Sequence, residues 1–111
     1  MENIRTLIFY DHYFNSFYSG QSEKVKAKID YVLYILTVAE RILKKHFLHI
    51  TKGLYEIRVE YESNIYRIFS CFDEGKIVVL FNGYQKKSQK TPRSEIDKAL
   101  HIMNEYLNEK K

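Results

Sequence analysis

The sequence predicts an α+β fold in which helices pack on a mostly antiparallel sheet. Apolar residues recur at three- and four-residue steps from about Glu23 to about Lys44, as they do on the buried face of a helix. Three strand-like segments follow, joined by turns so short that neighbouring strands must run antiparallel. A second helical pattern ends the chain. The predicted order is therefore β-α-α-β-β-β-α, and 111 residues fit one domain over residues 1–111.

The N-terminal part predicts one strand and two helices. Ile4–Tyr10 is rich in apolar residues, and His12–Ser19 has aromatic residues at helical spacing. Ser22 is a suitable N-cap for the long helix, because its hydroxyl can accept a backbone N–H. We interpret His46–Thr51 as a further helical turn, which Lys52-Gly53 ends. The buried stripe predicted for the long helix consists of Val25, Ile29, Val32, Leu33, Leu36, Ala39 and Leu43.

The rest of the chain predicts three strands and a helix. Tyr55–Tyr61 alternates apolar and charged residues, Ile65–Phe72 is the second strand, and Ile77–Phe81 is a continuous apolar run expected at the centre of the sheet. Gly75 precedes the third strand, where the turn calls for a positive φ. Thr91-Pro92 predicts a helix start, with the threonine as N-cap and the proline at the first helical position. The predicted stripe of that helix consists of Ile96, Ala99, Leu100, Met103 and Leu107.

Composition favours a polyanionic partner. The net charge is +4 and the sequence pI is about 9.1. No apolar run is long enough to cross a bilayer, and the N-terminus lacks the apolar core of a signal peptide, so we expect a cytoplasmic protein that binds no membrane. Cys71 is the one cysteine, so no internal disulfide can form. Its place inside a predicted strand favours a buried structural thiol over a nucleophile.

The sequence predicts neither a metal site nor a cofactor. The histidines share no spacing typical of metal ligands beyond one three-residue step, and no cysteine pair occurs. The four glycines are isolated, so there is no glycine-rich phosphate loop. A surface location is the simpler interpretation of all four histidines, which are His12, His46, His49 and His101.

Basic residues are expected to converge on one face of the sheet. Arg58 and Arg67 lie on adjacent predicted strands, whose backbones are about 5 Å apart. Arg67 stands on a largely apolar face, where a basic residue is unusual and favours a function. Arginine and lysine donors stabilise the charge that grows on phosphoryl oxygens when a phosphodiester is cleaved. Further cations follow the third strand with no acid among them, namely Lys86, Lys87, Lys90 and Arg93.

These side chains also have structural interpretations. Arg58 could have the purely structural role of pairing with Glu56 or Glu60 of its own strand. The lysine run could be a solvated loop. Nearby aromatic rings could stack on unpaired bases or could pack in the core. The rings in question belong to Tyr55, Tyr66 and Tyr84.

Three segments carry a more specific pattern. Gly53–Arg58 reads Gly-Leu-Tyr-Glu-Ile-Arg, and Tyr66–Phe69 reads Tyr-Arg-Ile-Phe. Val79–Pro92 starts as a hydrophobic strand and ends in Lys-Lys-Ser-Gln-Lys-Thr-Pro. In order and spacing, over roughly the last two-thirds of the chain, the three segments resemble the phage-derived branch of the RelE/HigB toxins.

The resemblance implies a RelE-like fold and an RNA endonuclease that cleaves mRNA, usually on the translating ribosome. It implies that the ribose 2′-hydroxyl attacks the neighbouring phosphate without a metal or cofactor. Arg67 matches the arginine that stabilises this phosphate in the transition state, and Arg58 matches a basic position at the active face. Lys86 and Lys87 match the basic pair that grips phosphate. The implied partner is a cognate antitoxin, commonly a helix-turn-helix DNA-binding protein.

The C-terminal part of the pattern departs from the family. Several members supply a Tyr or His there as proton donor or stacking group, whereas Lys90–Arg93 contains neither. The general acid is therefore unassigned. Lys90 is one candidate, but a free lysine titrates near pH 10.4, so action as a general base would require a lowered pKa. The residues expected to bind RNA are Lys90, Tyr84, Tyr55 and Arg93.

Two functions other than mRNA cleavage remain open from the sequence. The fold could serve as a non-catalytic module that binds RNA or protein through its basic face. The chain could also be a phage-derived protein that interferes with its host.

Overall fold

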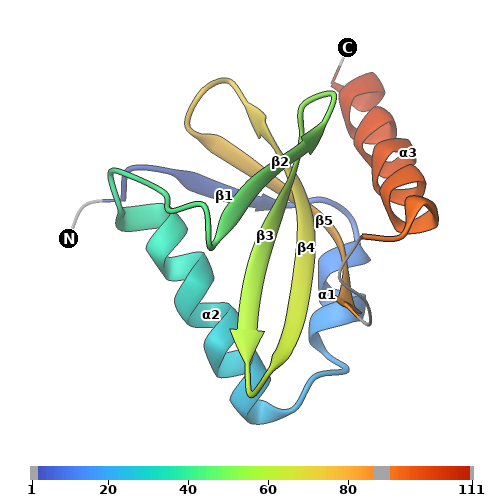
Figure 1. The fold of residues 1–111 in the computed structure, drawn as a ribbon. Coiled ribbons are helices and arrows are strands. Elements are labelled where there is room, and N and C mark those ends of the chain that lie inside the picture. Colours follow the sequence, from blue (N-terminus) through green and yellow to red (C-terminus); the bar gives the residue numbers. More distant parts are fainter. Residues whose placement is uncertain (1–2, 87–90, 111) are drawn as a thin grey trace.

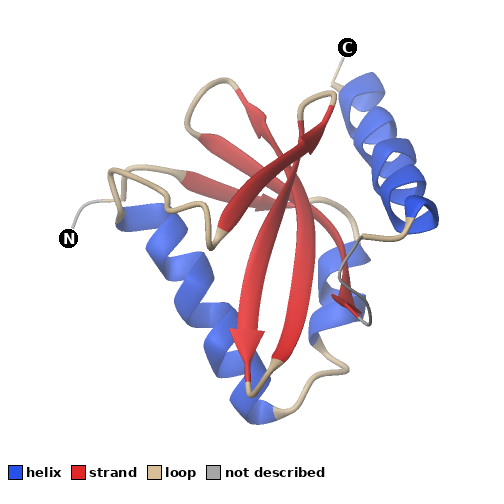
Figure 2. Cartoon of the chain, in the orientation of Figure 1, coloured by secondary structure: helices blue, strands red, loops and turns tan. Residues whose placement is uncertain are grey.

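The computed structural model describes residues 3–86 and 91–110 (Figure 1). Its elements are β1 (Thr6–Phe9), α1 (Tyr13–Tyr18), α2 (Glu23–Val38), β2 (Phe47–Thr51), β3 (Leu54–Tyr61), β4 (Asn64–Asp73), β5 (Ile77–Lys86) and α3 (Arg93–Glu109). The strands form one sheet in the order β1-β5-β4-β3-β2. β1 runs parallel to β5, and the other pairs are antiparallel. The predicted α+β fold with a mostly antiparallel sheet is confirmed (Figure 2).

Helices cover both faces of the sheet (Figure 1). On one face, the α2 face, α1 and α2 pack against Ile57 and Val59 of β3. On the other, the α3 face, α3 packs against Phe69 and Cys71 of β4. Successive residues of a strand point to opposite faces, so each strand contributes to both cores. The predicted stripe of α2 is buried at Val25, Ile29, Val32, Leu33 and Leu36.

The apolar run in β5 lies at a central position, as predicted. β5 is hydrogen-bonded to β1 on one side and to β4 on the other. Each of the residues from Val78 to Phe81 is fully buried. The strand does not stop at Phe81, where the sequence predicts its end, but continues to Lys86. The polar residues after Phe81 are therefore part of the sheet.

The prediction of a helical turn over His46–Thr51 is wrong, because β2 occupies this segment. Phe47 pairs with Ile57, and His49 pairs with Tyr55. Lys52 and Gly53 both have positive φ, at 49° and 82°, and form a two-residue hairpin turn rather than a helix end. The segment is too short for helical and strand periodicity to be distinguished, and pairing with β3 decides its structure.

The prediction that the long helix reaches Lys44 is also wrong. α2 ends at Val38, and Ala39 is already extended, with ψ at 132°. The Arg5 guanidinium donates to the carbonyl oxygens of Ala39 at 2.6 Å and Glu40 at 2.9 Å. A cation thus satisfies carbonyls that a longer helix would have bonded internally. Leu43, assigned to the buried stripe, is 51% exposed.

The start of α3 differs from the prediction by one residue. Pro92 is the N-cap residue, and no side chain caps this helix. Thr91, the predicted cap, instead donates its hydroxyl to Glu56 Oε1 at 3.2 Å. Leu107 lies at the end of the predicted stripe and is exposed, and Tyr106 is the residue of this turn that packs against the core of the α3 face. None of the helices in the described ranges is long and apolar enough to span a bilayer.

Candidate functional site

The α3 face carries a row of polar side chains across the three middle strands. Arg58 of β3 pairs with Arg67 of β4, and Arg67 pairs with Tyr84 of β5. Residues that pair across neighbouring strands project from the same face, so these three side chains lie side by side. The structure thus brings together the two arginines that the sequence places on adjacent strands.

An irregularity in β5 gives Tyr84 its place in this row. The pairing register between β4 and β5 shifts by one residue, as it does at a β-bulge. The shift lets Phe81 and Tyr84 point to the same face although they are three residues apart. Gly83 points to the opposite face, where a Cβ would lie only 2.6 Å from the Phe17 ring. The absence of a side chain at Gly83 therefore lets α1 pack closely on β5 at this point.

Arg67 is neutralised by a buried carboxylate. Its Nη1 forms an ion pair with Glu56 Oε2, and the two residues are 2% and 0% exposed. Glu56 is diagonal to Arg67 across β3 and β4, within reach of a long side chain. The Thr91 hydroxyl binds the other carboxylate oxygen of Glu56. Burial lowers the pKa of the Arg67 guanidinium, and the nearby Tyr84 hydroxyl acts in the opposite direction.

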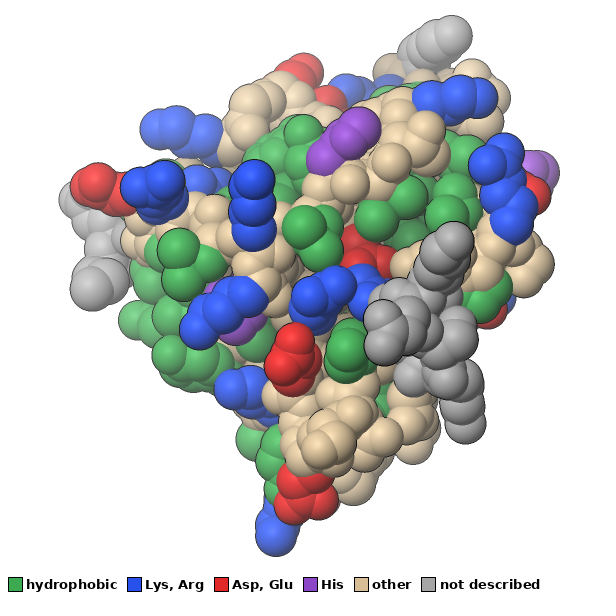
Figure 3. Space-filling model, in the orientation of Figure 1, with side chains coloured by type: hydrophobic (Ala, Val, Ile, Leu, Met, Phe, Trp, Pro, Cys, Tyr) green, Lys and Arg blue, Asp and Glu red, His purple; other side chains and the backbone are tan. Residues whose placement is uncertain are grey.

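Arg58 is the more accessible arginine of the row. Its side chain is half-buried, and it has no ion-pair partner within the described ranges. The sequence leaves open a pair between Arg58 and a glutamate of its own strand, but Glu56 is engaged by Arg67. Figure 3 shows this side of the molecule, with basic side chains around its hollowed centre and acidic ones among them.

Tyr84 is held by packing. Its ring stacks on Phe69, with ring centroids 5.7 Å apart and planes inclined by 13°. One side of the tyrosine ring is therefore already covered. Burial raises the pKa of the Tyr84 hydroxyl, so the phenol stays protonated at neutral pH.

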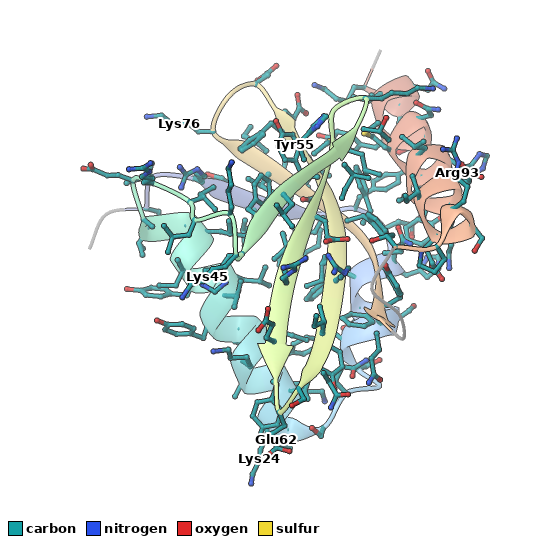
Figure 4. All side chains as sticks on the ribbon, in the orientation of Figure 1. Lys24, Lys45, Tyr55, Glu62, Lys76 and Arg93 are labelled. Atoms are coloured by element: carbon teal, nitrogen blue, oxygen red, sulfur yellow. The ribbon has the colours of Figure 1, made fainter. Side chains whose placement is uncertain are left out.

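Three other predicted site residues lie away from the row. Tyr55 belongs to the core of the α2 face and stacks on Phe47, with ring centroids 4.8 Å apart. Tyr66 is buried in the same core. Both have the opposite strand parity to Arg58 and Arg67, so the sheet directs them to the other face. Arg93 lies on α3, 80% exposed, and its Nε binds Asp97 at 3.0 Å (Figure 4).

The predicted lysines are described only in part. Lys86 ends β5, and its backbone pairs with Ile65 of β4, two residues beyond Tyr84 in the strand. Lys87 and Lys90 lie outside the described residues. The described part of the site therefore consists of the Arg58–Arg67–Tyr84 row and the end of β5.

Sequence reasoning missed the role of Glu56. Strand alternation places this glutamate on the charged side of β3, where the sequence suggested only a pair with Arg58. The signal that could have found it is Arg67 on an apolar strand face, because a buried guanidinium requires a nearby counter-charge. The diagonal acid on the neighbouring strand is Glu56.

No cluster of three or more potential metal ligands occurs among residues 3–86 and 91–110. Cys71 is a free, buried thiol, as the sequence predicts. Burial raises its pKa to about 11, which suppresses the thiolate that nucleophilic chemistry requires.

A comparison with protein families identifies the chain. The family model described as phage derived protein Gp49-like (DUF891) matches residues 16–104. The match includes all of α2, every strand from β2 to β5 and most of α3. It therefore contains Arg58, Arg67 and Tyr84, which we call the arginine row. No curated protein matches the chain. The chain therefore belongs to the phage-derived Gp49-like family, a toxin-like family related to RelE.

Proposed function

We propose that this protein is a HigB-like toxin of a toxin–antitoxin pair, which acts in the cytoplasm as an endonuclease on ribosome-bound mRNA. Membership of a RelE-related, toxin-like family supports the proposal. The net charge of +4 suits a polyanionic substrate. The row on the α3 face supplies cationic donors on rigid strands, where electrostatic stabilisation needs little reorganisation.

The observation that carries the proposal is the pairing of Arg58 with Arg67 on adjacent strands. Two guanidinium groups directly opposite one another repel unless an anion lies close to them. Glu56 offsets the charge of Arg67. Arg58 then retains its positive charge beside the fixed Arg67–Glu56 pair, and we expect a phosphodiester to bind at this position.

In the proposed reaction, the 2′-oxygen of a ribose attacks the adjacent phosphorus. The 2′-hydroxyl gives its proton to solvent as the O2′–P bond forms, the P–O5′ bond breaks, and the leaving 5′-oxygen takes a proton from solvent, so the products are a 2′,3′-cyclic phosphate and a 5′-hydroxyl. Arg58 contacts a non-bridging phosphate oxygen and stabilises the negative charge that grows on it, and Arg67, held by Glu56, positions Arg58 from the neighbouring strand. Lys86 and Lys87 bind phosphate, and Lys90 and Tyr84 contact the RNA strand. The reaction requires no metal.

The proposed partner is a helix-turn-helix antitoxin. An acidic segment of such a protein would be complementary to the arginine row. Covering the row would block access to the phosphate and so would neutralise the toxin.

The test is a translation reaction with a defined mRNA, in which cut ends are mapped. We expect the wild type to cut the mRNA and Arg58→Gln to cut it about 100-fold more slowly, the loss typical of one transition-state donor. Lys76→Gln is the control, because that lysine is exposed in the β4–β5 turn and lies away from the row (Figure 4). No cutting by the folded wild type, or equal cutting by Arg58→Gln, contradicts the proposal.

One observation favours a second candidate, a non-catalytic module that binds RNA or protein. Arg67, the residue that matches the catalytic arginine, is 2% exposed and ion-paired. A guanidinium in that state organises the face rather than contacting a ligand directly. The same assay separates the two candidates, because the binding module retains RNA or a protein partner without producing cuts.

A further inference from the structure

A hollow of about 140 Å³ lies beside the arginine row, between α2 and β3. We call it the α2–β3 pocket. Lys45 is one of its lining residues, and Figure 4 shows it beside α2 and the start of β2. The lining comes from three parts of the chain, with Lys28 on α2, Lys45 and His46 in the segment before β2, and Arg58 and Glu60 on β3.

The charge of the pocket is positive. Three of the five lining side chains are permanent cations, and one is an acid. No ion pair engages Lys28, Lys45 or Arg58 within the described ranges. Lys28 Nζ lies 5.5 Å from the centroid of the Tyr31 ring, which helps to hold it at the pocket. Clustered cations of this kind attract a small anionic group.

The donors of the pocket are pre-positioned but not all satisfied. Arg58 Nε is buried and has no hydrogen-bond partner among the described residues. The backbone N–H of Arg58 donates to the His46 carbonyl at 2.9 Å, which fixes the loop against β3. A buried donor without an acceptor is costly, so an anion that supplied an oxygen here would gain that bond at little cost in ordering.

The pKa of His46 is affected by the charges of the same pocket. Burial and the positive charges of Lys45 and Lys28 lower its pKa, while a hydrogen bond between its side chain and the Arg58 backbone and the charge of Glu60 act in the opposite direction. An anion bound among these groups would offset the lysines and would raise the pKa of His46.

We propose that the α2–β3 pocket binds a backbone phosphate of the RNA, adjacent to the phosphate held at the arginine row. This inference rests on the proposed RNA substrate and adds a second contact to it. Arg58 belongs to both places, because it lines the pocket and pairs with Arg67. A strand that lies across β4 and β3 therefore reaches the pocket on leaving the row. Lys28 and Lys45 would hold its phosphate without taking part in cleavage.

The test measures binding of a fully 2′-O-methylated oligoribonucleotide, which keeps the phosphates but lacks the attacking hydroxyl. Affinity is measured by fluorescence anisotropy over a range of salt concentrations for wild type, Lys28→Gln and Lys45→Gln. Loss of one phosphate contact to a single strand should reduce the slope of log affinity against log salt by about 0.7, or about fivefold in affinity at 0.1 M salt. Glu60→Gln should instead tighten binding, because it removes the one acid of the pocket.

Lys24→Gln is the matched control, since this lysine is also on α2 but lies far from Lys45, near the β3–β4 turn (Figure 4). It should bind RNA as the wild type does. Equal losses in Lys24→Gln and Lys28→Gln would overturn the proposal, because they would indicate a diffuse charge effect. Unchanged affinity in Lys28→Gln and Lys45→Gln would overturn it as well.

A second readout follows the His46 ring by NMR while inorganic phosphate or the methylated RNA is added. We expect the RNA to raise the pKa of His46 in the wild type. A response to inorganic phosphate but not to RNA would overturn the proposal, because the pocket would then bind small anions only. RNA binding that depends on the pocket without any mRNA cleavage would contradict the nuclease proposal alone. Cleavage with unchanged binding in the lysine variants would contradict the pocket alone.

Discussion

The Arg67 guanidinium and the Glu56 carboxylate form an ion pair that is sealed from solvent on the α3 face of the sheet. The Thr91 hydroxyl donates to the same carboxylate, so the segment before α3 is linked to this pair. Removing one charge from a buried pair is costly, because the other charge remains without compensation. The pair therefore couples the candidate site to the stability of the fold.

The first prediction concerns this pair. Glu56→Gln should lower the free energy of unfolding by about 3–5 kcal/mol, since it leaves the Arg67 charge uncompensated inside the protein. Urea denaturation measures the change. The control is Asp97→Asn, which breaks the exposed Arg93–Asp97 pair and should cost at most about 0.5 kcal/mol. Similar losses in the two variants would mean that Arg67 keeps access to water.

Local patterns in the sequence predicted most of the sheet but missed one of its strands. The alternation in Tyr55–Tyr61 and the apolar run in Ile77–Phe81 depend on burial within one strand, so they are visible locally. The end of α2 depends on Arg5, which is distant in sequence. The strand β2 depends on pairing with β3. Such long-range contacts leave no periodic signal.

The candidate site could be predicted only in part for the same reason. The motif carried by Arg58 and Arg67 is local, and their relation follows from a short hairpin. The position of Tyr84 depends on the irregularity in β5, which the sequence did not indicate. The partner of Arg67 required the diagonal register between β3 and β4, which fixes Glu56 beside it.

The second prediction concerns the contact between β5 and α1. Gly83→Ala should destabilise the protein by about 1–3 kcal/mol, because the new methyl group would overlap the Phe17 ring at 2.6 Å. Gly20→Ala is the matched control, because its Cβ would make only an ordinary contact of 3.7 Å with the Phe17 carbonyl. Thermal unfolding compares the variants. Recovery of stability in Gly83→Ala combined with Phe17→Leu would show that the ring is the cause.

The third prediction concerns the reactivity of Cys71. Its pKa of about 11 leaves about one part in a thousand as thiolate at pH 8, and the side chain is 4% exposed. Iodoacetamide should therefore modify the folded protein far more slowly than the protein unfolded in guanidinium chloride. Mass spectrometry measures both rates. Comparable rates would contradict a buried structural thiol.

The fourth prediction concerns Asp73, which joins the end of β4 to the C-terminal turn of α3. Tyr106 donates its hydroxyl to Asp73 Oδ2 at 2.5 Å, and Lys110 forms an ion pair with Oδ1. These contacts, that with Lys110 foremost, hold the pKa of Asp73 below its ordinary value of 3.8 in the folded state. The unfolded chain therefore binds more protons than the folded chain as the pH falls through this range.

Asp73 therefore stabilises the folded protein at neutral pH but not at low pH. The contribution of Asp73 is fully present above its unfolded pKa and disappears as the pH falls from about 4 through the lower pKa of the folded state. Urea denaturation between pH 6 and pH 2 should therefore show a smaller acid-induced loss in Asp73→Asn than in the wild type. Asp30→Asn is the control, because Asp30 is an exposed aspartate bound by the Tyr18 hydroxyl and has no cationic partner among the described residues. Parallel curves for wild type and Asp73→Asn would show that α3 docks on β4 without this carboxylate, through the apolar contacts of Ala99 and Met103 alone.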